Sequence, residues 1–359
     1  MRSLSSLDIH YLCNELKFLE GSKVEKIVQS GKDFFFRLYK EGSKHTLRFN
    51  PEGFFHLTNK RIVAPRTPPG YCTFLRKYLK SSNLQSLEQV SFERIVKLVF
   101  SYKDDVFELF IELFSPGNVV LVKDGLIMHP LERQRFKSRS LDSKKSYVMP
   151  SQKINLKTLS ETDFFKEAVV TKELGRFLAV DLGLGGVYSE ELVKRTGLDK
   201  SIGVNELRMA DKRLVFNEIK NLLSNDLKPI LSSGEVYPFP LKNGSGVEKE
   251  FVSYSEAYDY FFEYSEQESV VSKKEKKDKL SSMIDIQQKR ILDLEKEAEE
   301  NARIGDYIYA NYSDFDKLVK TLWLVKEESG WEGVSKKVKE LKNYVGFDKK
   351  NKKLSLEFK

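Results

Sequence analysis

Three short segments between residues 68 and 121 constrain the fold of this chain more than any other part of its sequence. Residues 68–79, Pro-Pro-Gly-Tyr-Cys-Thr-Phe-Leu-Arg-Lys-Tyr-Leu, combine a Pro-Gly turn with a helical run that carries cations in its second half. Residues 91–100 are rich in β-branched and aromatic side chains, as strands are, and begin near an acid–base pair. Residues 112–121 place Pro-Gly-Asn between two apolar runs, which is the turn chemistry of a β-hairpin.

These segments, in this order and at this spacing, resemble the NFACT-N domain of the RqcH/NEMF family, once called fibronectin-binding protein A-like. The family pattern reads roughly FCxxLRK(Y/H)L, then (D/E)RI(I/V)xxxF, then ExxxxGNxxL, and this chain carries a version of each piece. The resemblance extends almost from end to end. It implies a factor of ribosome-associated quality control that binds tRNA and the large ribosomal subunit. Such a factor supports template-free extension of the C-terminus of a stalled nascent chain.

The charge balance is compatible with an RNA partner. The chain has 359 residues, long enough for two or three domains, and its formal net charge is +8 with 32% charged residues. A basic excess favours a polyanion such as RNA as partner. A soluble basic protein without such a partner would show the same charge balance.

The cysteines and histidines predict neither a disulfide nor a metal site. Cys13 and Cys72 each lie among apolar residues on a helical pattern, so we expect buried, reduced thiols and a reducing compartment. The four histidines have no cysteine or carboxylate at metal-ligand spacing, and we expect no metal and no cofactor. A signal-peptide pattern and an apolar run of about 20 residues are both absent, so we expect a soluble, cytoplasmic protein without a membrane partner.

We predict an α+β chain of three parts. The first, residues 1–168, would be a glycosylase-like, β-rich NFACT-N domain that opens with a helix over residues 4–19. Antiparallel strands are expected over 24–57 and again after the helix at Pro68. The run at 106–114 has bulky side chains on both faces, so it should lie within a two-layer packing.

The second part, residues 169–267, is predicted to be helical around a glycine-rich hairpin. Helices over 172–180 and 187–195 would flank Gly183, Gly185 and Gly186, whose backbone N–H groups at a helix N-terminus could hold an anion. The segment resembles the helix-two-turn-helix of formamidopyrimidine-DNA glycosylases. That motif has asparagine where this chain has Gly186, so only the backbone amides carry over as a phosphate-binding hairpin. A close-packed helical hairpin that requires glycine fits the same residues equally well.

The third part, residues 268–359, is predicted to begin a coiled-coil arm. Apolar residues recur at alternating spacings of four and three, as in a coiled-coil seam. The seam positions are Leu280, Ile284, Gln287, Ile291, Leu294 and Ala298. A single stripe needs a partner helix, which would come from residues 318–341, from another chain or from sequence outside this one. Residues 354–359 resemble the first strand of the family's next module, so we expect the chain to be an N-terminal fragment of a longer protein.

Glu93 and Arg94 are the strongest candidate site. If they lie on an extended strand, neighbouring side chains point to opposite faces, so the two would not neutralise each other. Arg94 could then reach a phosphate or a base edge, and Glu93 could accept from a base amine. The resemblance ties this position, usually Asp-Arg, to tRNA recognition. An ordinary ion pair at a strand end is the alternative.

Two further groups of cations are candidates for tRNA binding. Arg133, Arg135, Lys137 and Arg139 recur at every second residue, so in an extended segment they would line one edge at intervals of about 6.6 Å. Such a comb suits an RNA backbone, whereas a mobile solvated loop would place the same cations at random. Arg76 and Lys77, on the helix that begins near Pro68, are a fainter candidate.

The residues predict a binding and positioning factor without a covalent active site. We find no nucleophile elbow, P-loop or dinucleotide fingerprint. The chain begins Met1-Arg2-Ser3 and lacks the N-terminal proline that the glycosylase reaction needs. The expected partners are tRNA, the large ribosomal subunit and the stalled nascent-chain complex. A nucleic-acid-processing enzyme on a glycosylase-like scaffold and a structural, protein-binding coiled-coil protein remain the alternatives.

Overall fold

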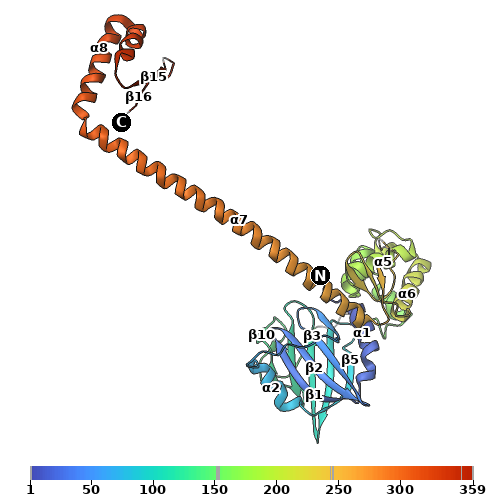
Figure 1. Cartoon of the computed structure of the whole chain (residues 1–359). Coiled ribbons are helices and arrows are strands. Elements are labelled where there is room, and N and C mark those ends of the chain that lie inside the picture. Colours follow the sequence, from blue (N-terminus) through green and yellow to red (C-terminus); the bar gives the residue numbers. More distant parts are fainter. Residues whose placement is uncertain (1, 151–153, 243, 245, 349, 358–359) are drawn as a thin grey trace. The chain divides into compact units, whose positions relative to one another are not determined.

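The computed structural model of this chain divides into two compact units, Met1–Glu268 and Ser269–Lys359, which we describe separately (Figure 1). It describes residues 2–150, 154–242, 244, 246–348 and 350–357, without the side chains of residues 264–282 and 285. The predicted domain limits at residues 168 and 267 stay predictions.

The first unit is built on one antiparallel sheet of nine strands. From edge to edge the strands are β4 (Phe54–Leu57), β3 (Ser43–Asn50), β2 (Asp33–Lys40), β1 (Lys23–Ser30), β5 (Asn83–Gln89), β6 (Ile95–Tyr102), β7 (Asp105–Glu112), β8 (Asn118–Lys123) and β9 (Leu126–Pro130). The short strands β10 (Gln134–Arg135) and β11 (Ser140–Leu141) follow and pair with each other. The predicted α+β fold class and the antiparallel strands are confirmed.

Both faces of β7 are covered, as its sequence predicts. Phe107, Leu109 and Ile111 are buried in the main core, which also contains the apolar faces of two helices. Phe110 points to the other face, where its ring stacks on Tyr147 at 4.0 Å between centroids. Two hydrophobic layers therefore enclose this half of the sheet.

Two helices pack on the main core. Helix α1 (Ser6–Leu16) begins with a capping box between Ser5 and Asp8, and continues as the 3₁₀ turn η1 (Lys17–Leu19). Helix α2 (Gly70–Leu79) buries Cys72, Leu75 and Leu79 along one face, as helical spacing requires. Cys13 and Cys72 are free and buried, as expected.

A group of short helices makes up the second half of the first unit. The helices are α3 (Glu161–Glu167), α4 (Leu174–Arg176), the π-helix η2 (Phe177–Asp181), α5 (Gly185–Thr196), the 3₁₀ turn η3 (Val204–Glu206) and α6 (Met209–Ser224). A small sheet of β12 (Ile230–Ser232), β13 (Glu235–Tyr237) and β14 (Lys249–Glu250) follows. The predicted helix over 172–180 is thus split into α4 and η2. Gly197, with φ +70°, ends α5 in the left-handed conformation, where glycine carries no Cβ penalty.

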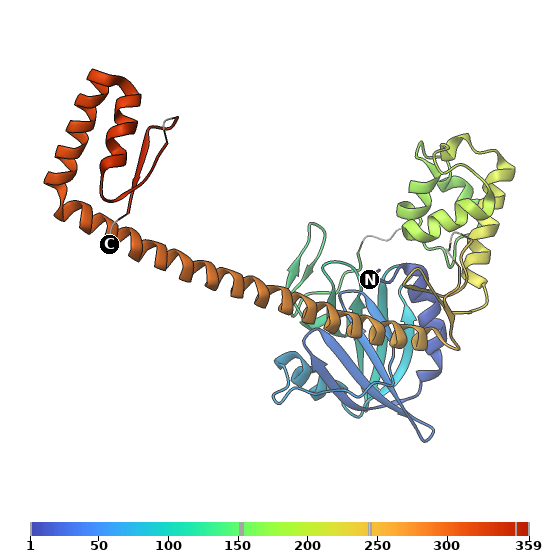
Figure 2. The same ribbon diagram turned by 45° about the horizontal axis from the view of Figure 1, so that its top comes forward.

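The second unit holds most of a long helix and a small folded end (Figure 2). Helix α7 (Tyr254–Ala310) starts in the first unit, and α8 (Tyr312–Lys337) follows it. The 3₁₀ turn η4 (Val338–Glu340) and a hairpin of β15 (Tyr344–Asp348) and β16 (Lys353–Leu356) complete the unit. The expected terminal strand is therefore paired with β15, while Phe358 and Lys359 lie outside the described residues.

The predicted seam of the arm is uncovered in this structure. Ile284, Ile291 and Leu294 are 52%, 54% and 46% exposed. The side chain of Leu280 lies outside the described residues. The second unit thus provides a long helix with an apolar stripe, and the coiled coil stays a prediction.

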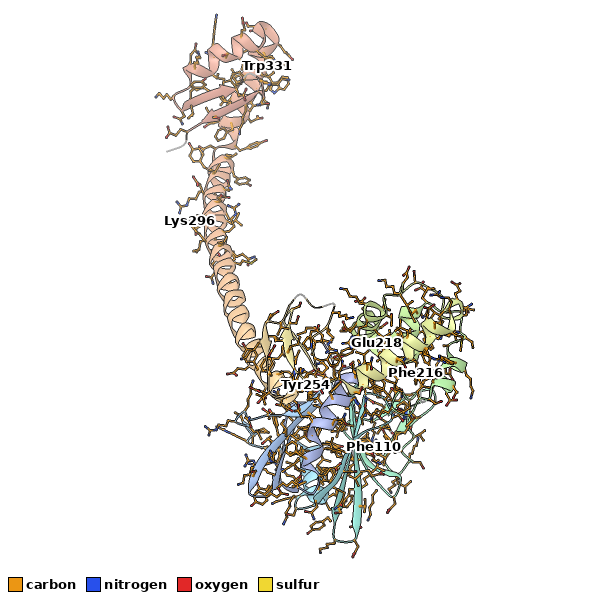
Figure 3. The ribbon with its side chains drawn as sticks, turned by 90° about the vertical axis from the view of Figure 1, so that its right-hand side faces the viewer. Phe110, Phe216, Glu218, Tyr254, Lys296 and Trp331 are labelled. Atoms are coloured by element: carbon orange, nitrogen blue, oxygen red, sulfur yellow. The ribbon has the colours of Figure 1, made fainter. Side chains whose placement is uncertain are left out.

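A single buried carboxylate, Asp8, connects the parts of the first unit. It is fully buried, and Arg2 donates two hydrogen bonds to it, at 2.8 and 3.1 Å. The hydroxyls of Tyr188 on α5 and Tyr254 on α7 donate to its Oδ1, at 2.5 and 2.7 Å. Tyr254 is labelled in Figure 3. Ser5 donates to Oδ2 through its backbone N–H and its hydroxyl, both at 2.7 Å. Segments far apart in sequence therefore meet on one side chain.

The surroundings of Asp8 keep it ionised. Burial alone would raise the pKa of its carboxyl group, but the charge of Arg2 and the hydrogen bonds from Arg2, Tyr188 and Tyr254 outweigh burial and lower the pKa. Burial and the nearby carboxylate in turn raise the pKa of the Tyr188 hydroxyl well above its usual value. The tyrosines therefore stay protonated and donate.

Asp8→Asn should lower the free energy of unfolding by about 3–5 kcal/mol, because it removes the two-pronged partner of Arg2 and leaves only Glu235, 3.5 Å from the Arg2 Nε. Since the folded-state pKa of Asp8 is lowered, its contribution is complete above its unfolded pKa of about 3.9 and is lost as the pH falls below that value. The difference between the parent and the variant in urea denaturation should therefore shrink in acid.

Asp163→Asn is the matched control for this test. Asp163 occupies the same position after the N-cap Ser160 of α3, yet it is exposed. We expect a much smaller loss of stability and little change with pH. Equal losses in the two variants would contradict the central role of Asp8.

Candidate nucleic-acid interface

Glu93 and Arg94 lie in the bend directly before β6, not on the strand itself. Their backbone is held firmly: the Glu93 N–H donates to Val90 O at 3.0 Å, and the Leu113 N–H donates to Arg94 O at 2.8 Å. The prediction that Glu93 and Arg94 lie on opposite faces of a strand is therefore wrong, because a bend sets the directions of their side chains.

The side chains of Glu93 and Arg94 are partly exposed. Within the described ranges, neither side chain has a hydrogen bond or an ion pair, to the other or to a third group. The proposed alternative of an ordinary ion pair at a strand end therefore has no contact to support it. An unpaired guanidinium on a rigid backbone is available to an incoming ligand.

The glycine hairpin also takes the geometry that an anion site requires. Gly183 and Gly185 have φ of +73° and +77°, the left-handed region that favours glycine. The N-cap of α5 is Leu184, and it makes no side-chain capping hydrogen bond. A Cβ added to Gly186 would meet no atom within 4 Å. The first turn of α5 thus has N–H groups without a cap and an open approach to them.

The structure brings these two predicted sites together. Glu93, Arg94 and the glycine hairpin line one open cavity of about 670 Å³, although some 90 residues separate them in sequence. The remaining wall comes mainly from the N-terminal segment, Phe114 and Tyr188. A guanidinium, a carboxylate and a helix N-terminus therefore face one space.

A second cavity of about 720 Å³ adjoins the first. The two share Ala179 and Gly186 in their walls, so they form neighbouring parts of one surface. Arg176, Lys194 and Lys200 line the second cavity, together with Glu173 and Glu190 among its polar residues. Cations from α4, from α5 and from the loop after α5 thus lie beside the first cavity.

Arg2 and Tyr188 are cavity residues that the sequence reading missed. The Arg2 guanidinium lies 5.5 Å from the centre of the Tyr188 ring, and both groups are bound to Asp8. Burial would lower the pKa of Arg2, but Asp8 raises it, so the cation is present and already paired. Ser5-x-x-Asp8 is recognisable as a capping box, but nothing local points to the tyrosines.

The predicted basic comb is wrong. The segment turns back on itself, since the Phe136 N–H donates to Arg139 O at 2.8 Å and the short strands β10 and β11 pair. Arg139 is only 8% exposed and makes a two-pronged ion pair with the buried Glu112, at 2.5 and 2.8 Å. The Tyr147 hydroxyl donates to the same carboxylate at 2.8 Å. Arg139 therefore stabilises the fold.

The other predicted cations lie outside the cavity. Arg133, Arg135, Lys137 and Lys77 are exposed, and Arg135 lies 3.6 Å from Asp142. Arg76 is partly buried and donates from Nε to Ile27 O at 2.7 Å. That bond fixes its side chain against β1, which leaves Lys77 as the freer cation of the two.

The Gly-Asn pair of the third sequence segment has a structural role. A Cβ at Gly117 would collide with the carbonyl oxygen of Pro51. Asn118 is fully buried, donates to Glu132 O at 2.7 Å and accepts from the Val119 N–H at 2.9 Å. Asn118 pairs with Glu112 across β7 and β8, so these residues hold the turn of the β7–β8 hairpin.

Comparison with known proteins places the whole arrangement in a family. The sequence model described as NFACT N-terminal and middle domains matches residues 5–340. The chain belongs to the NFACT family. The archaeal Rqc2 homolog aRqcH of Methanocaldococcus jannaschii is 28% identical to it over 370 residues, covering 95% of this chain and 55% of that protein. The ribosome quality control complex subunit 2 of Saccharomyces cerevisiae is 37% identical over 134 residues, 36% of this chain and 13% of the yeast protein.

Two solved structures share the fold over most of this chain. The N-terminal part of the fibronectin/fibrinogen-binding protein of Streptococcus suis matches with a TM-score of 0.62 at 21% identity, covering 73% of this chain and 99% of that one. The fibrinogen binding protein of Staphylococcus aureus matches with a TM-score of 0.59 at 18% identity, covering 72% and 98%.

The described residues include neither a helix suited to a membrane nor a cluster of metal-ligating side chains. No helix in the described part is long and apolar enough to cross a bilayer. Across the described residues, no group of three or more His, Cys, Asp or Glu side chains could hold a metal ion.

Arg139→Ala should lower the free energy of unfolding by about 3 kcal/mol or more, because it leaves the Glu112 carboxylate buried without its cation. Arg135→Ala, four residues earlier and 82% exposed in its side chain, should change stability little. Urea denaturation measures both. RNA binding by folded Arg139→Ala should match the parent. A selective loss of RNA affinity with unchanged stability would show that Arg139 contacts RNA, as the basic comb predicted.

Proposed function

We propose that this chain is the tRNA-binding and large-subunit-binding part of a ribosome-associated quality control factor. In that role it would support template-free tailing of stalled nascent chains. The names of its relatives support the ribosomal role. Because the chain spans 55% of the archaeal relative, the activity of the whole protein forms part of the proposal.

The shared cavity of Arg94 and the glycine hairpin is the observation that carries the tRNA proposal. A guanidinium offers a planar fork of donors that matches phosphate oxygens, and it stays charged at any physiological pH. The uncapped first turn of α5 adds N–H donors and about half a positive charge from the helix dipole. Together they suit a backbone phosphate at the cavity.

Glu93 would contribute selectivity. A carboxylate beside a phosphate site repels a bare polyanion, so it is useful only if it receives a specific donor. Base amines are such donors, because an ionised carboxylate can only accept hydrogen bonds. We propose that Arg94 holds the backbone or a base edge while Glu93 accepts from a base.

The cations of the second cavity would extend the contact. Arg176 at the end of α4, Lys194 on α5 and Lys200 after α5 line the second cavity, which shares Ala179 and Gly186 with the first. An RNA backbone carries a charge at every nucleotide, so a line of cations fits it better than it fits a compact small anion. The exposed Lys77, Arg133, Arg135 and Lys137 remain proposed as outlying tRNA contacts.

We further propose a binding and positioning role without a covalent active site in this chain. The ribosome would supply peptide-bond chemistry, and the chain would hold tRNA and the stalled nascent-chain complex in register. Such a factor would work in the cytoplasm, where translating ribosomes are.

Arg94→Ala should weaken tRNA binding about tenfold to a hundredfold, the cost of truncating a charge-assisted contact. Arg94→Lys should weaken it nearly as much if the contact is two-pronged, because an ammonium cannot reproduce the fork. In a salt titration, the slope of log K against log salt should fall by about one phosphate contact in Arg94→Ala. Fluorescence anisotropy with labelled tRNA measures affinity and slope.

Arg208→Ala is the surface control: its side chain is 83% exposed and lines neither cavity, so tRNA affinity should stay close to that of the parent. Unchanged tRNA affinity and unchanged tailing in Arg94→Ala, with a lowered melting temperature, would show that Arg94 serves the fold.

Gly186→Glu and Gly186→Gln test the helix N-terminus separately. Neither side chain meets a neighbour at its Cβ, so both variants should fold. If a phosphate approaches this turn, the added carboxylate should weaken tRNA binding more than the neutral amide of the same size does. Equal affinities in the two variants, matching the parent, would place the RNA elsewhere.

A further inference from the structure

The second unit contains an aromatic pocket that the proposed tRNA site does not use. Helix α8 and the β15–β16 hairpin enclose a cavity of about 320 Å³. Its aromatic wall is made of Trp323, Trp331 and Phe347, and Trp331 stacks on Phe347 with ring centres 6.3 Å apart. Trp331 is labelled in Figure 3. Trp323 remains 55% exposed, so a large apolar ring faces solvent at this pocket, as is typical of a surface that a ligand covers.

A break in α8 creates this pocket. Gly330 has φ +63° and ψ −169°, a conformation that is essentially restricted to glycine. The helix therefore changes direction between Trp323 and Trp331 and brings the two indoles to the same cavity. Val334 and Val338, 2% and 0% exposed, anchor the segment after the break.

Two lysines accompany the indoles. The ammonium of Lys326 lies 3.9 Å from the centre of the Trp323 ring and 5.6 Å from that of Trp331. The ammonium of Lys352, in the β15–β16 turn, lies 5.4 Å from the Trp331 ring. None of the residues that line the pocket is acidic. The pocket therefore combines π-faces with unopposed positive charge.

We propose that this pocket binds an unpaired nucleotide of single-stranded RNA. A nucleotide supplies both complements at once, a flat base for the indoles and a phosphate for the lysines. The volume lies at the small end of ligand pockets and suits one base. Bases within a duplex are stacked and cannot enter, so the pocket would select loops, bulges or single strands.

The two tryptophans of the chain are Trp323 and Trp331, so its entire tryptophan fluorescence reports on this pocket. The full chain carrying Arg94→Ala, which removes the contact proposed for the first unit, is titrated with a short oligoadenylate. We expect saturable quenching that weakens with salt. The same strand annealed to oligouridylate should quench little.

Variants then assign the effect to named groups. Trp323→Ala should weaken oligoadenylate binding by about 5- to 150-fold, the range for loss of one stacking partner, read through Trp331. Lys326→Ala should also weaken binding, while Lys317→Ala, an exposed lysine of α8 outside the pocket, should not. Circular dichroism checks that each variant is folded. The milder variant Trp331→Phe leaves Trp323 as the fluorophore and so gives a second measurement of oligoadenylate binding.

Several results would overturn this proposal. They are absence of quenching by oligoadenylate, equal quenching by the duplex, and quenching instead by an acidic peptide containing phenylalanine, which would make the pocket a protein site. The outcome is independent of the tRNA proposal. Arg94→Ala affects only the tRNA site, and Lys326→Ala affects only this pocket.

Discussion

The buried carboxylate of Asp8 is the interaction on which the first unit depends. An isolated charge in a protein interior is strongly unfavourable, and Asp8 is tolerated because six donor groups from three separate segments surround it. Arg2, Tyr188 and Tyr254 must all be present for the charge to be satisfied. Apolar packing would allow α5 and α7 to slide, whereas these directional bonds specify one arrangement.

This requirement explains how a rigid cavity forms beside the connection between β5 and β6. Tyr188 belongs to α5, whose first turn faces Arg94, so the bond from Tyr188 to Asp8 fixes the glycine hairpin relative to α1. On the other side, Gln89 donates to Ser6 O at 2.8 Å and to Glu93 O at 2.9 Å. The N-terminal segment therefore connects both walls. Precise placement matters because a guanidinium fork loses its advantage over an ammonium when its geometry drifts.

Much of this fold could be predicted from local sequence. Alternating apolar residues gave the strands, a Pro-Gly turn marked α2, and Gly197 marked the end of α5, because each signal acts within a few residues. Both halves of the candidate site were also recognisable by residue type. Their proximity, and the Asp8 contacts 180 and 246 residues along the chain, depend on tertiary packing that no local pattern encodes.

Arg139 shows the physical limit of such a reading. Arg135, Lys137 and Arg139 recur at every second residue, as on one face of a strand, but this period carries meaning only where the backbone is extended. Here the chain turns, and Glu112, buried on β7, requires a cation of its own. A buried acid 27 residues away decided the role of Arg139.

The missing cap of α5 links ligand binding to folding. An N-cap side chain typically contributes about 1 kcal/mol to a helix, and Leu184 cannot supply it. In the free folded protein, the N–H groups of this turn therefore receive no hydrogen-bond acceptor from an N-cap side chain. A ligand phosphate that meets it acts as an external cap, and mass action then stabilises the folded state in proportion to occupancy. The helical half of the first unit would then be more stable with bound RNA than without it, so release of the ligand and a fall in the stability of the fold would be thermodynamically linked.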